Sequence, residues 1–450
     1  MANTVRQPNL FRIVPNAVTL KIYRTSDIPL QYNLTASTLE VNLYEDIDRA
    51  YISGQIHILD SSAIASLNFT GSESIVLRLW NNEDYQIEKE FVIWQVTDHT
   101  PINETTTSFV LHIMEPHAFL NNFRFVSRAY NNNHSKIIQN VLKDYLNVDA
   151  DIEESFQSSK VVVPNLRPLQ VCNWLTQDST SQYGEPFFLY SSLKEGLKLR
   201  SLGSLYAEDA LPIRFQKNPA APAEFNGHAK HILAHASISN ERMVDIQRKG
   251  LLRAERFVID PFTNSIRSKT YDYKAYFDKK VAENRELYDG LPYDPSFPIN
   301  GEERLGTSNP IYASSVNTSL SFGSTTTGID EESTLNDHLL IRQAEGDRYM
   351  LDKNAANVTI PGWHMLAYEE NTSIGRIIDI NIPKPSPSTV RNNAEAILDQ
   401  KYSGKFLITN VRHKFSFYEP AENYVAALTL KRTSNLDNST VTGNLNEEPL

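Results

Sequence analysis

The chain has 450 residues and a mass of 51.1 kDa, which corresponds to roughly three domains of ordinary size. Hydrophobic residues make up 40% of it and charged residues 22%, so it can bury a sizeable core, and disorder of the whole chain is excluded. The net charge of −11 disfavours a main role in gripping nucleic-acid phosphates, and a single cysteine, Cys172, excludes an intrachain disulfide framework and a cysteine-rich zinc site.

Six segments in the first quarter of the chain alternate apolar and polar residues with the period of a β-strand. They lie at 20–23, 39–44, 55–58, 76–80, 91–96 and 109–113. Turn residues separate them, as at 70–72 and 81–84, and no helical pattern intervenes. Short strands at regular spacing predict a meander that closes into a sandwich or barrel.

The pattern changes to a helical period in the middle of the chain. Within 135–146, paired apolar residues recur four positions apart and predict one helix. A second helix is expected to begin near Pro168, because proline suits the first helical turn. Two strands follow, at 187–190 and 197–199. Residues 126–206 therefore read as a small α/β insertion.

The last half is mixed. A proline- and alanine-rich linker is expected at 218–223, and residues 255–330 have few clean periods, which is typical of a long insertion. A helix is predicted from Glu332 to Arg348. Strand alternation then returns and predicts a second barrel-like domain, with strands expected at 358–360, 365–366, 377–380, 406–411 and 424–430.

These patterns predict a mainly β chain with an α+β insertion: two β-barrel domains plus a small α/β domain. The first barrel domain is expected at 1–125 and the α/β domain at 126–210. The second barrel domain is expected at 211–435, with a long insertion at about 255–345. Residues 436–450 are expected to form a flexible polar tail.

A search for catalytic motifs finds no glycine-rich dinucleotide or phosphate loop, no serine elbow of the hydrolase type and no His-Glu-X-X-His zinc motif. No catalytic, cofactor-binding or metal site is therefore predicted, and the chain is not expected to be an enzyme. No apolar run approaches the roughly 20 residues of a membrane span, and residues 1–8 lack the apolar core of a secretory signal. We expect no membrane-spanning segment and a cytosol-like compartment.

For several isolated residues, a chemical role and a purely structural role are both compatible with the sequence. Cys172 could act as a nucleophile, but it lies on the apolar face of the second predicted helix, which favours a buried small hydrophobe. His228, His231 and His235 could hold a metal if they lie on a helix, but the segment fits a strand equally well. Without a carboxylate close by, surface or interface histidines are favoured.

Two acidic patterns are read in the same way. One alternates like a calcium loop but lacks the glycine and the closing glutamate, so a solvated acidic loop is favoured for Asp149, Asp151, Glu153 and Glu154. Glu370 and Asp379 have the spacing of a muramidase pair, but Pro385 stands where that motif needs threonine.

The four tryptophans are scattered along the chain at Trp80, Trp94, Trp174 and Trp363. Aromatic residues of strand-rich proteins usually belong to the core, which is the interpretation favoured here. A sugar-binding surface is the alternative.

The order of these pieces resembles the baseplate hub proteins of contractile-tailed phages. The resemblance covers roughly residues 15–435 and starts with the first barrel and the helix at 135–146. It is carried by structural turns and hydrophobic rhythm, most specifically in VPNLRPLQVCNWL at 163–175, FFLY at 187–190, GLKL at 196–199, IPG at 360–362, GRIIDINIP at 375–383 and SGKFLITNVRH at 403–413.

This resemblance implies a structural virion protein without enzymatic activity, in the tail baseplate and assembled in the host cytoplasm. The family forms a homotrimer in which each chain contributes two similar barrels, so that six barrels form a ring. The ring adapts the hexameric tail tube protein to the trimeric central spike protein and forms part of the DNA conduit, with DNA only passing through the lumen. Tape-measure and baseplate wedge proteins are further implied partners. An acidic lumen wall would repel DNA.

Three other interpretations remain open: a tail-associated cell-wall hydrolase, a module that binds host glycans, and the hub part of a secretion-system spike. The first needs a carboxylate pair or a zinc triad, and the second needs an exposed aromatic groove. Secretion spikes usually continue into a repetitive β-helix, and no short repeat occurs in this sequence.

Overall fold

The architecture is that of a computed structural model. The residues that it describes are 18–22, 30–61, 69–71, 73–81, 85–156, 158–211, 214–216, 232–239, 253–260, 265–282, 296–299, 302–305, 311–314, 331–366, 372–382, 403–417 and 424–433. The expected linker at 218–223 and the expected tail at 436–450 lie outside these ranges.

The first strand-rich region is antiparallel in the order β3-β4-β7-β6-β5-β1-β2, and it is not the meander that the sequence predicts, because β4 pairs with β7 and β5 pairs with β1. It consists of β1 (Val18–Ile22), β2 (Leu30–Asn33), β3 (Thr38–Asp46), β4 (Ser53–Asp60), β5 (Glu73–Asn81), β6 (Tyr85–Pro101) and β7 (Thr107–Met114), with a short 3-10 turn, η1 (Thr35–Ser37). The six predicted strands are confirmed. The sequence pattern missed β2, because it has only four residues and they are largely exposed.

The second strand-rich region has the order β14-β20-β23-β22, with β21 and β13 branching from β22. It is built from β13 (Arg214–Gln216), β14 (Ala234–Ser239), β20 (Asn354–Pro361), β21 (Ile377–Asn381), β22 (Gly404–Ser416) and β23 (Tyr424–Arg432). The expected strand at 365–366 is instead the end of a short helix, α10 (Trp363–Leu366). It follows Gly362, whose close approach to the Tyr424 ring leaves no room for a side chain.

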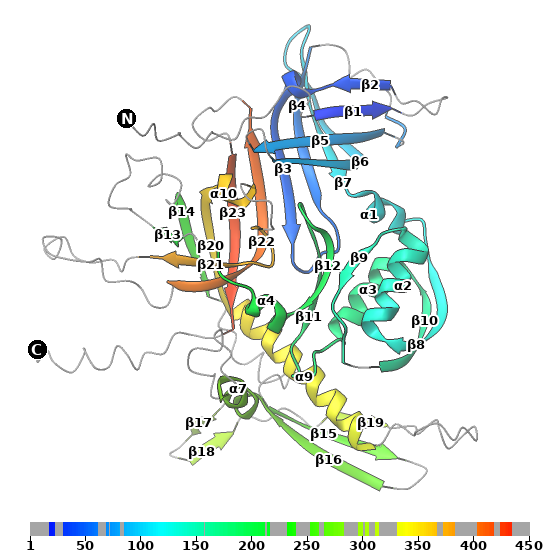
Figure 1. The fold of residues 1–450 in the computed structure, drawn as a ribbon, viewed down its shortest axis with the longest axis vertical. Coiled ribbons are helices and arrows are strands. Elements are labelled where there is room, and N and C mark those ends of the chain that lie inside the picture. Colours follow the sequence, from blue (N-terminus) through cyan, green and yellow to red (C-terminus); the bar gives the residue numbers. More distant parts are fainter. Residues whose placement is uncertain are drawn as a thin grey trace, which may run out of the picture.

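The two strand-rich regions are joined into one 13-stranded sheet by antiparallel pairing of β3 with β22 (Figure 1). One apolar core runs under both regions and includes Leu43 and Ile56 of the first and Val411 and Leu428 of the second. The mainly β class is confirmed. The expectation of two separate barrels is not confirmed. Among the described strands no sheet closes on itself, and the edges of β3 and β22 pair with each other.

The middle of the chain packs two helices against short strands, as expected. Its elements are α1 (Pro116–Asn121), β8 (Val126–Asn133), α2 (His134–Leu146), β9 (Ala150–Ile152), β10 (Ser158–Leu166), α3 (Pro168–Gln177), β11 (Phe187–Ser192), β12 (Gly196–Ser201) and α4 (Leu202–Ala207). Asn147 ends α2 in a left-handed conformation, a common helix stop. The predicted helices and the hairpin are confirmed, and they enclose a core of their own.

The described residues between 253 and 314 form a three-stranded sheet, a separate two-stranded sheet and one helix, which the sequence did not predict. The elements are β15 (Arg253–Asp260), β16 (Ser265–Asp272), α7 (Tyr273–Ala282), β17 (Ser296–Ile299), β18 (Glu302–Leu305) and β19 (Ile311–Ser314). The chain returns through α9 (Glu331–Lys353), which confirms and extends the predicted helix. In Figure 1, α9 runs from the three-stranded sheet towards β20 and β23. It contacts β15 and β16 of that sheet as well as β20 and β23. No described helix is long and apolar enough to cross a membrane.

Candidate functional site

The outer face of the 13-stranded sheet is polar where the two strand-rich regions meet. On β3, Glu40, Asn42 and Tyr44 alternate with core residues and face outward. Arg412 of β22 lies opposite Tyr44 and donates from Nε to Oδ1 of Asn42 at 2.9 Å. Lys414 Nζ lies 3.3 Å from Glu40 Oε2. The junction therefore matches each of its two cations with an acceptor on the neighbouring strand.

This face is hollowed across β3, β22, β23 and β20. The hollow has a volume of about 630 Å³, and side chains of mixed polarity line it, among them Tyr44, Asn357, Thr359, Asn410, Arg412 and Thr429. It is wide, and the ionisable side chains Asp46, Arg49 and Arg412 of its lining already have partners, since Asp46 lies 3.7 Å from Arg49 and Arg412 binds Asn42. Its chemistry therefore fits contact with a large partner better than conversion of a small substrate.

Behind the junction lies a fully buried polar cluster. Glu45 of β3 and His413 of β22 are 1% and 0% exposed, and Glu45 Oε2 lies 3.1 Å from His413 Nε2. The hydroxyl of Tyr424 is 2.7 Å from His413 Nδ1. Because a carboxylate only accepts hydrogen bonds, Nε2 donates to Glu45, and Nδ1 is hydrogen-bonded to the Tyr424 hydroxyl on the other side of the ring. The order resembles a catalytic relay, but a substrate cannot reach it.

The other oxygen of Glu45 holds the turn between β11 and β12. Glu45 Oε1 accepts from the backbone N–H of Leu193. Burial alone would raise the pKa of Glu45, but the His413 ring and the hydrogen bonds from Leu193 and Ser373 hold that pKa below its ordinary value. The ionised carboxylate therefore belongs to the folded state and ties the sheet to the α/β region.

A second buried carboxylate fixes the same turn from the neighbouring strands. Glu115 accepts from the N–H of Ile52 at 2.7 Å and from Lys89 Nζ at 2.8 Å. Lys89 Nζ also donates to the carbonyl of Ser192 at 3.1 Å. Side-chain charges of the sheet thus satisfy an N–H and a carbonyl of one turn.

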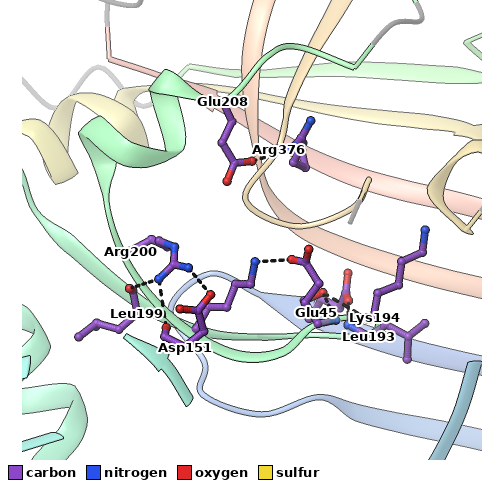
Figure 2. A network of polar contacts seen from close by, with 11 residues as sticks. Glu45, Asp151, Leu193, Lys194, Leu199, Arg200, Glu208 and Arg376 are labelled. Atoms are coloured by element: carbon purple, nitrogen blue, oxygen red, sulfur yellow. Dashed lines mark hydrogen bonds and ion pairs between the residues drawn. The ribbon is translucent and has the colours of Figure 1, made fainter. Parts of the chain in front are cut away.

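Ion pairs on the flank of this turn continue the contact (Figure 2). Arg200 of β12 binds Asp151 of β9, and Arg376 lies 2.8 Å from Glu208, which follows α4. Arg376 comes from the second strand-rich region, so this pair connects that region to the end of the α/β segment. Lys194 stands beside Glu45 in the same view, and burial lowers its pKa to about 8, against the opposing attraction of Glu45 and Glu195.

Helix α9 is anchored by Arg348. The guanidinium pairs with Asp48 at 3.2 Å, donates to the carbonyl of Phe187 and lies 4.4 Å from the centre of the Phe188 ring. Burial lowers the pKa of Arg348, partly opposed by Asp48. One side chain of α9 therefore reaches the turn between β3 and β4 and also the first residues of β11.

Helix α7 of the insertion is attached to α9 through Asp347, the residue before Arg348. Asp347 is completely buried and accepts hydrogen bonds from the hydroxyls of Tyr273 and Tyr276, at 2.9 and 2.8 Å. Tyr271, Phe277 and Met350 complete this apolar cluster. Charge and aromatic packing therefore hold the insertion to α9.

The residues that the sequence analysis singled out have structural roles. Cys172 is buried in the α/β core, and burial raises the pKa of its thiol, as expected of a small hydrophobe. His235 lies on strand β14, while His228 and His231 lie outside the described residues. In the acidic stretch, Asp151 pairs with Arg200, Glu153 accepts from Ser201, and Glu154 pairs with Lys136.

Asp379 lies on β21, and Glu370 is outside the described part of the chain. Within the described ranges, no group of three histidine, cysteine or acidic side chains could hold a metal ion. The core interpretation of the tryptophans is wrong for two of them: Trp94 is 47% exposed and Trp174 is 38% exposed. The side chains of Trp80 and Trp363 lie outside the described part of the structure.

Sequence reasoning missed the buried cluster, although a signal was present. Glu45 follows Val41 and Leu43 in the inward register of its strand, and His413 stands between Val411 and Phe415 in the same way. A charged or polar residue at a position that alternation assigns to the core predicts a buried partner. Because the two lie 368 positions apart, the sequence does not say that they are each other's partner.

Comparison with known proteins identifies the fold. No protein-family model and no curated protein matches the chain. Among solved structures, the tail protein from Neisseria meningitidis MC58 is similar with a TM-score of 0.53 and 10% identity, over 94% of this chain and 99% of that one. The 43 kDa tail protein of prophage MuSo2 from Shewanella oneidensis is similar with a TM-score of 0.51 and 9% identity, over 93% and 99%. The chain has the fold of phage tail proteins, which confirms the resemblance seen in its sequence at the level of the fold.

Proposed function

We propose that the chain is a structural component of a phage-type tail: a homotrimeric baseplate hub that adapts a hexameric tail tube to a trimeric central spike. In this role it belongs to the virion, is assembled in the host cytoplasm and has no catalytic activity. Its partners are the tail tube protein, the central spike protein and, at the periphery, tape-measure and wedge proteins. DNA passes through the lumen without being bound.

The observation that supports this role best is the pairing of β3 with β22. It makes one rigid sheet out of two strand-rich regions, so each chain offers two strand-rich units in a fixed relation. Three such chains around an axis present six units, which matches a sixfold partner on one side while keeping threefold symmetry on the other. Likeness of fold to two phage tail proteins supports the same role.

The polar outer face of this sheet is the surface that we assign to the conduit. Arg412 and Lys414 have acceptors on β3, so their charge is matched beside the strand. Such a wall offers DNA phosphates weak attraction, although it is less acidic than the sequence predicts for a lumen wall. Polar uncharged residues such as Thr359 and Thr429 complete it.

Images of the purified protein test the trimeric hub. Negative-stain class averages should show a ring with a central hole and six outer lobes, and light scattering should give three times the 51.1 kDa chain mass. Addition of the tail tube protein should cap one face of the ring. A compact dimer, or a closed ring of another symmetry, would contradict the proposal.

The conduit is tested in assembled particles. The variant Thr359→Lys/Thr429→Lys adds two cations to the proposed wall and should slow genome ejection, because unpaired cations bind phosphates. Asn131→Lys/Asn132→Lys adds the same charge on the exposed strand β8 and should leave ejection unchanged. Equal ejection rates for both variants would place the conduit elsewhere.

A further inference from the structure

An exposed aromatic protrusion follows helix α1. It consists of Leu120, Phe123, Arg124 and Phe125, and we call it the aromatic knob. The side chains of Phe123 and Phe125 are 66% and 52% exposed. Large apolar side chains gathered on a surface with an arginine among them are typical of a protein-binding site.

The knob is held in place from behind. The ring of Phe119 lies 5.2 Å from that of Phe123. Asn121 Oδ1 accepts from the N–H of Leu169 at 2.8 Å, and Asn122 Oδ1 accepts from Arg167 at 3.3 Å. These contacts tie the knob to the start of α3, so little conformational entropy is lost when a partner covers it.

An acidic groove lies at the other end of the α/β region. It has a volume of about 560 Å³, and Glu153 and Glu154 line it with no lysine, arginine or histidine. A third lining glutamate, Glu185, is only 2% exposed and accepts from the Ser181 hydroxyl. Phe156 and Tyr183, 56% and 41% exposed, are part of the same lining. Lys136 of α2 reaches Glu154 at 2.9 Å from outside the lining. The groove thus offers carboxylates beside aromatic surface.

The knob and the groove complement each other in charge and in apolar character, but they cannot meet within one chain. Strand β8 starts directly after the knob and ends at Asn133, which lines the groove. Eight residues of strand span roughly 25 Å. We propose that the aromatic knob of one copy docks into the acidic groove of a second copy of this chain.

Such a contact is heterologous, since it uses two different surfaces of each copy and leaves one of each free at the ends. Heterologous contacts close into a ring when the rotation between copies allows it. The inference rests on the proposed trimeric hub and names residues of its subunit contact: Phe123 and Arg124 on one side, Glu154 and Phe156 on the other.

Charge reversal tests the contact in the full-length chain. Arg124→Glu should weaken self-association at least about tenfold in sedimentation velocity, and so should Glu154→Arg, because each places like charges across the contact. The double variant Arg124→Glu/Glu154→Arg should recover association. Lys160→Glu and Glu104→Arg, at exposed positions outside both surfaces, are matched controls that should associate like the unmodified chain.

Mixing the two single variants distinguishes this geometry from a symmetric one. A copy with a reversed knob retains its groove, and a copy with a reversed groove retains its knob. The reversed knob also matches the reversed groove, so equal amounts should form alternating assemblies larger than a dimer, whereas a symmetric contact that uses both surfaces at once would stop at one-to-one dimers. Circular dichroism spectra matching the unmodified chain would establish that each variant is folded.

The outcomes separate this inference from the proposed function. If the unmodified chain forms trimers that both single variants leave intact, the docking is overturned and the hub proposal stands. If the unmodified chain stays monomeric at every concentration, the docking is likewise overturned, and binding of the tail tube protein then decides the hub proposal. Loss by single variants with recovery by the double variant supports the docking.

Discussion

The turn after β11 and helix α9 are both fixed to the 13-stranded sheet, but the charged side chains come from opposite partners in the two contacts. The turn contributes only backbone, its Leu193 N–H and Ser192 carbonyl, and the sheet supplies the charged side chains. Helix α9 contributes the charged side chains itself, Asp347 and Arg348, and its neighbours supply hydroxyls, a backbone carbonyl and one carboxylate.

The difference concerns where stability is concentrated. Backbone groups cannot be removed by substitution, so the contacts of the turn with charged side chains of the sheet depend on Glu45 and Lys89, and Glu45 is also the partner of His413. On α9, adjacent residues serve different neighbours, so each contact can be lost separately. We therefore expect a substitution at Glu45 to cost more than one at either anchor of α9.

The largest effect is expected for Glu45→Ala. It leaves the Leu193 N–H and the His413 ring without their carboxylate partner in a closed site, which should lower the free energy of unfolding by about 3–5 kcal/mol. Urea denaturation measures this directly. Glu40→Ala, on the same strand but on the outer face, should cost below about 1 kcal/mol. Similar losses for both variants would contradict a central role for the buried cluster.

Arg348→Met comes next. Methionine keeps much of the packing on Phe188, but the carbonyl of Phe187 loses its donor, so we expect a loss of about 2–3 kcal/mol. The exposed partner Asp48 is rehydrated and adds little. Hydrogen exchange should show that α9 opens more often in the variant while the strands β3 and β4 keep their protection. Equal opening of these strands would mean that Arg348 supports the whole sheet.

A smaller loss is expected for Tyr276→Phe. The ring stays in place, and only one of the two hydrogen bonds to Asp347 is lost, which corresponds to about 1.5–3 kcal/mol for a charged acceptor. Thermal unfolding of Tyr276→Phe, Tyr273→Phe and the double variant forms a cycle. Because both hydroxyls serve one carboxylate, the double variant should lose more than the sum of the single ones, and strict additivity would contradict the shared site.

The sequence predicted elements whose pattern is local. Helices α2 and α3 and the hairpin β11–β12 show their own periods and end signals, and six strands of the first region alternate clearly. The strands at 253–272 were missed, because Tyr271 packs in a cluster with Met350 of α9 and not in a sheet core with regular alternation.

Two features depend on contacts between distant parts of the chain and could not be predicted. The edge of β3 is taken by β22, about 370 positions later, and this pairing joins the two strand-rich regions into one sheet. The partner of Glu45 lies equally far away. A glutamate at a core position of its strand indicates a buried polar contact, but only the fold shows which residue is the partner.

The smallest effect has the opposite sign and arises beside the same turn, at Lys194. Burial lowers its pKa to about 8, whereas an unfolded lysine titrates near 10.4. Between these values the unfolded chain binds more protons than the folded one, so stability should rise with pH across this window; below pH 8 the folded state bears the cost of a buried charge.

Lys194→Met removes that cost and should stabilise the protein at pH 7 by about 1 kcal/mol, once partial exposure is taken into account. It should also flatten the dependence of the urea midpoint between pH 8 and pH 10, which the exposed control Lys160→Met should keep. A variant less stable than the unmodified chain at pH 7 would show that the attraction of Lys194 to Glu45 outweighs its desolvation, and that the turn is held by its own charge as well as by those of the sheet.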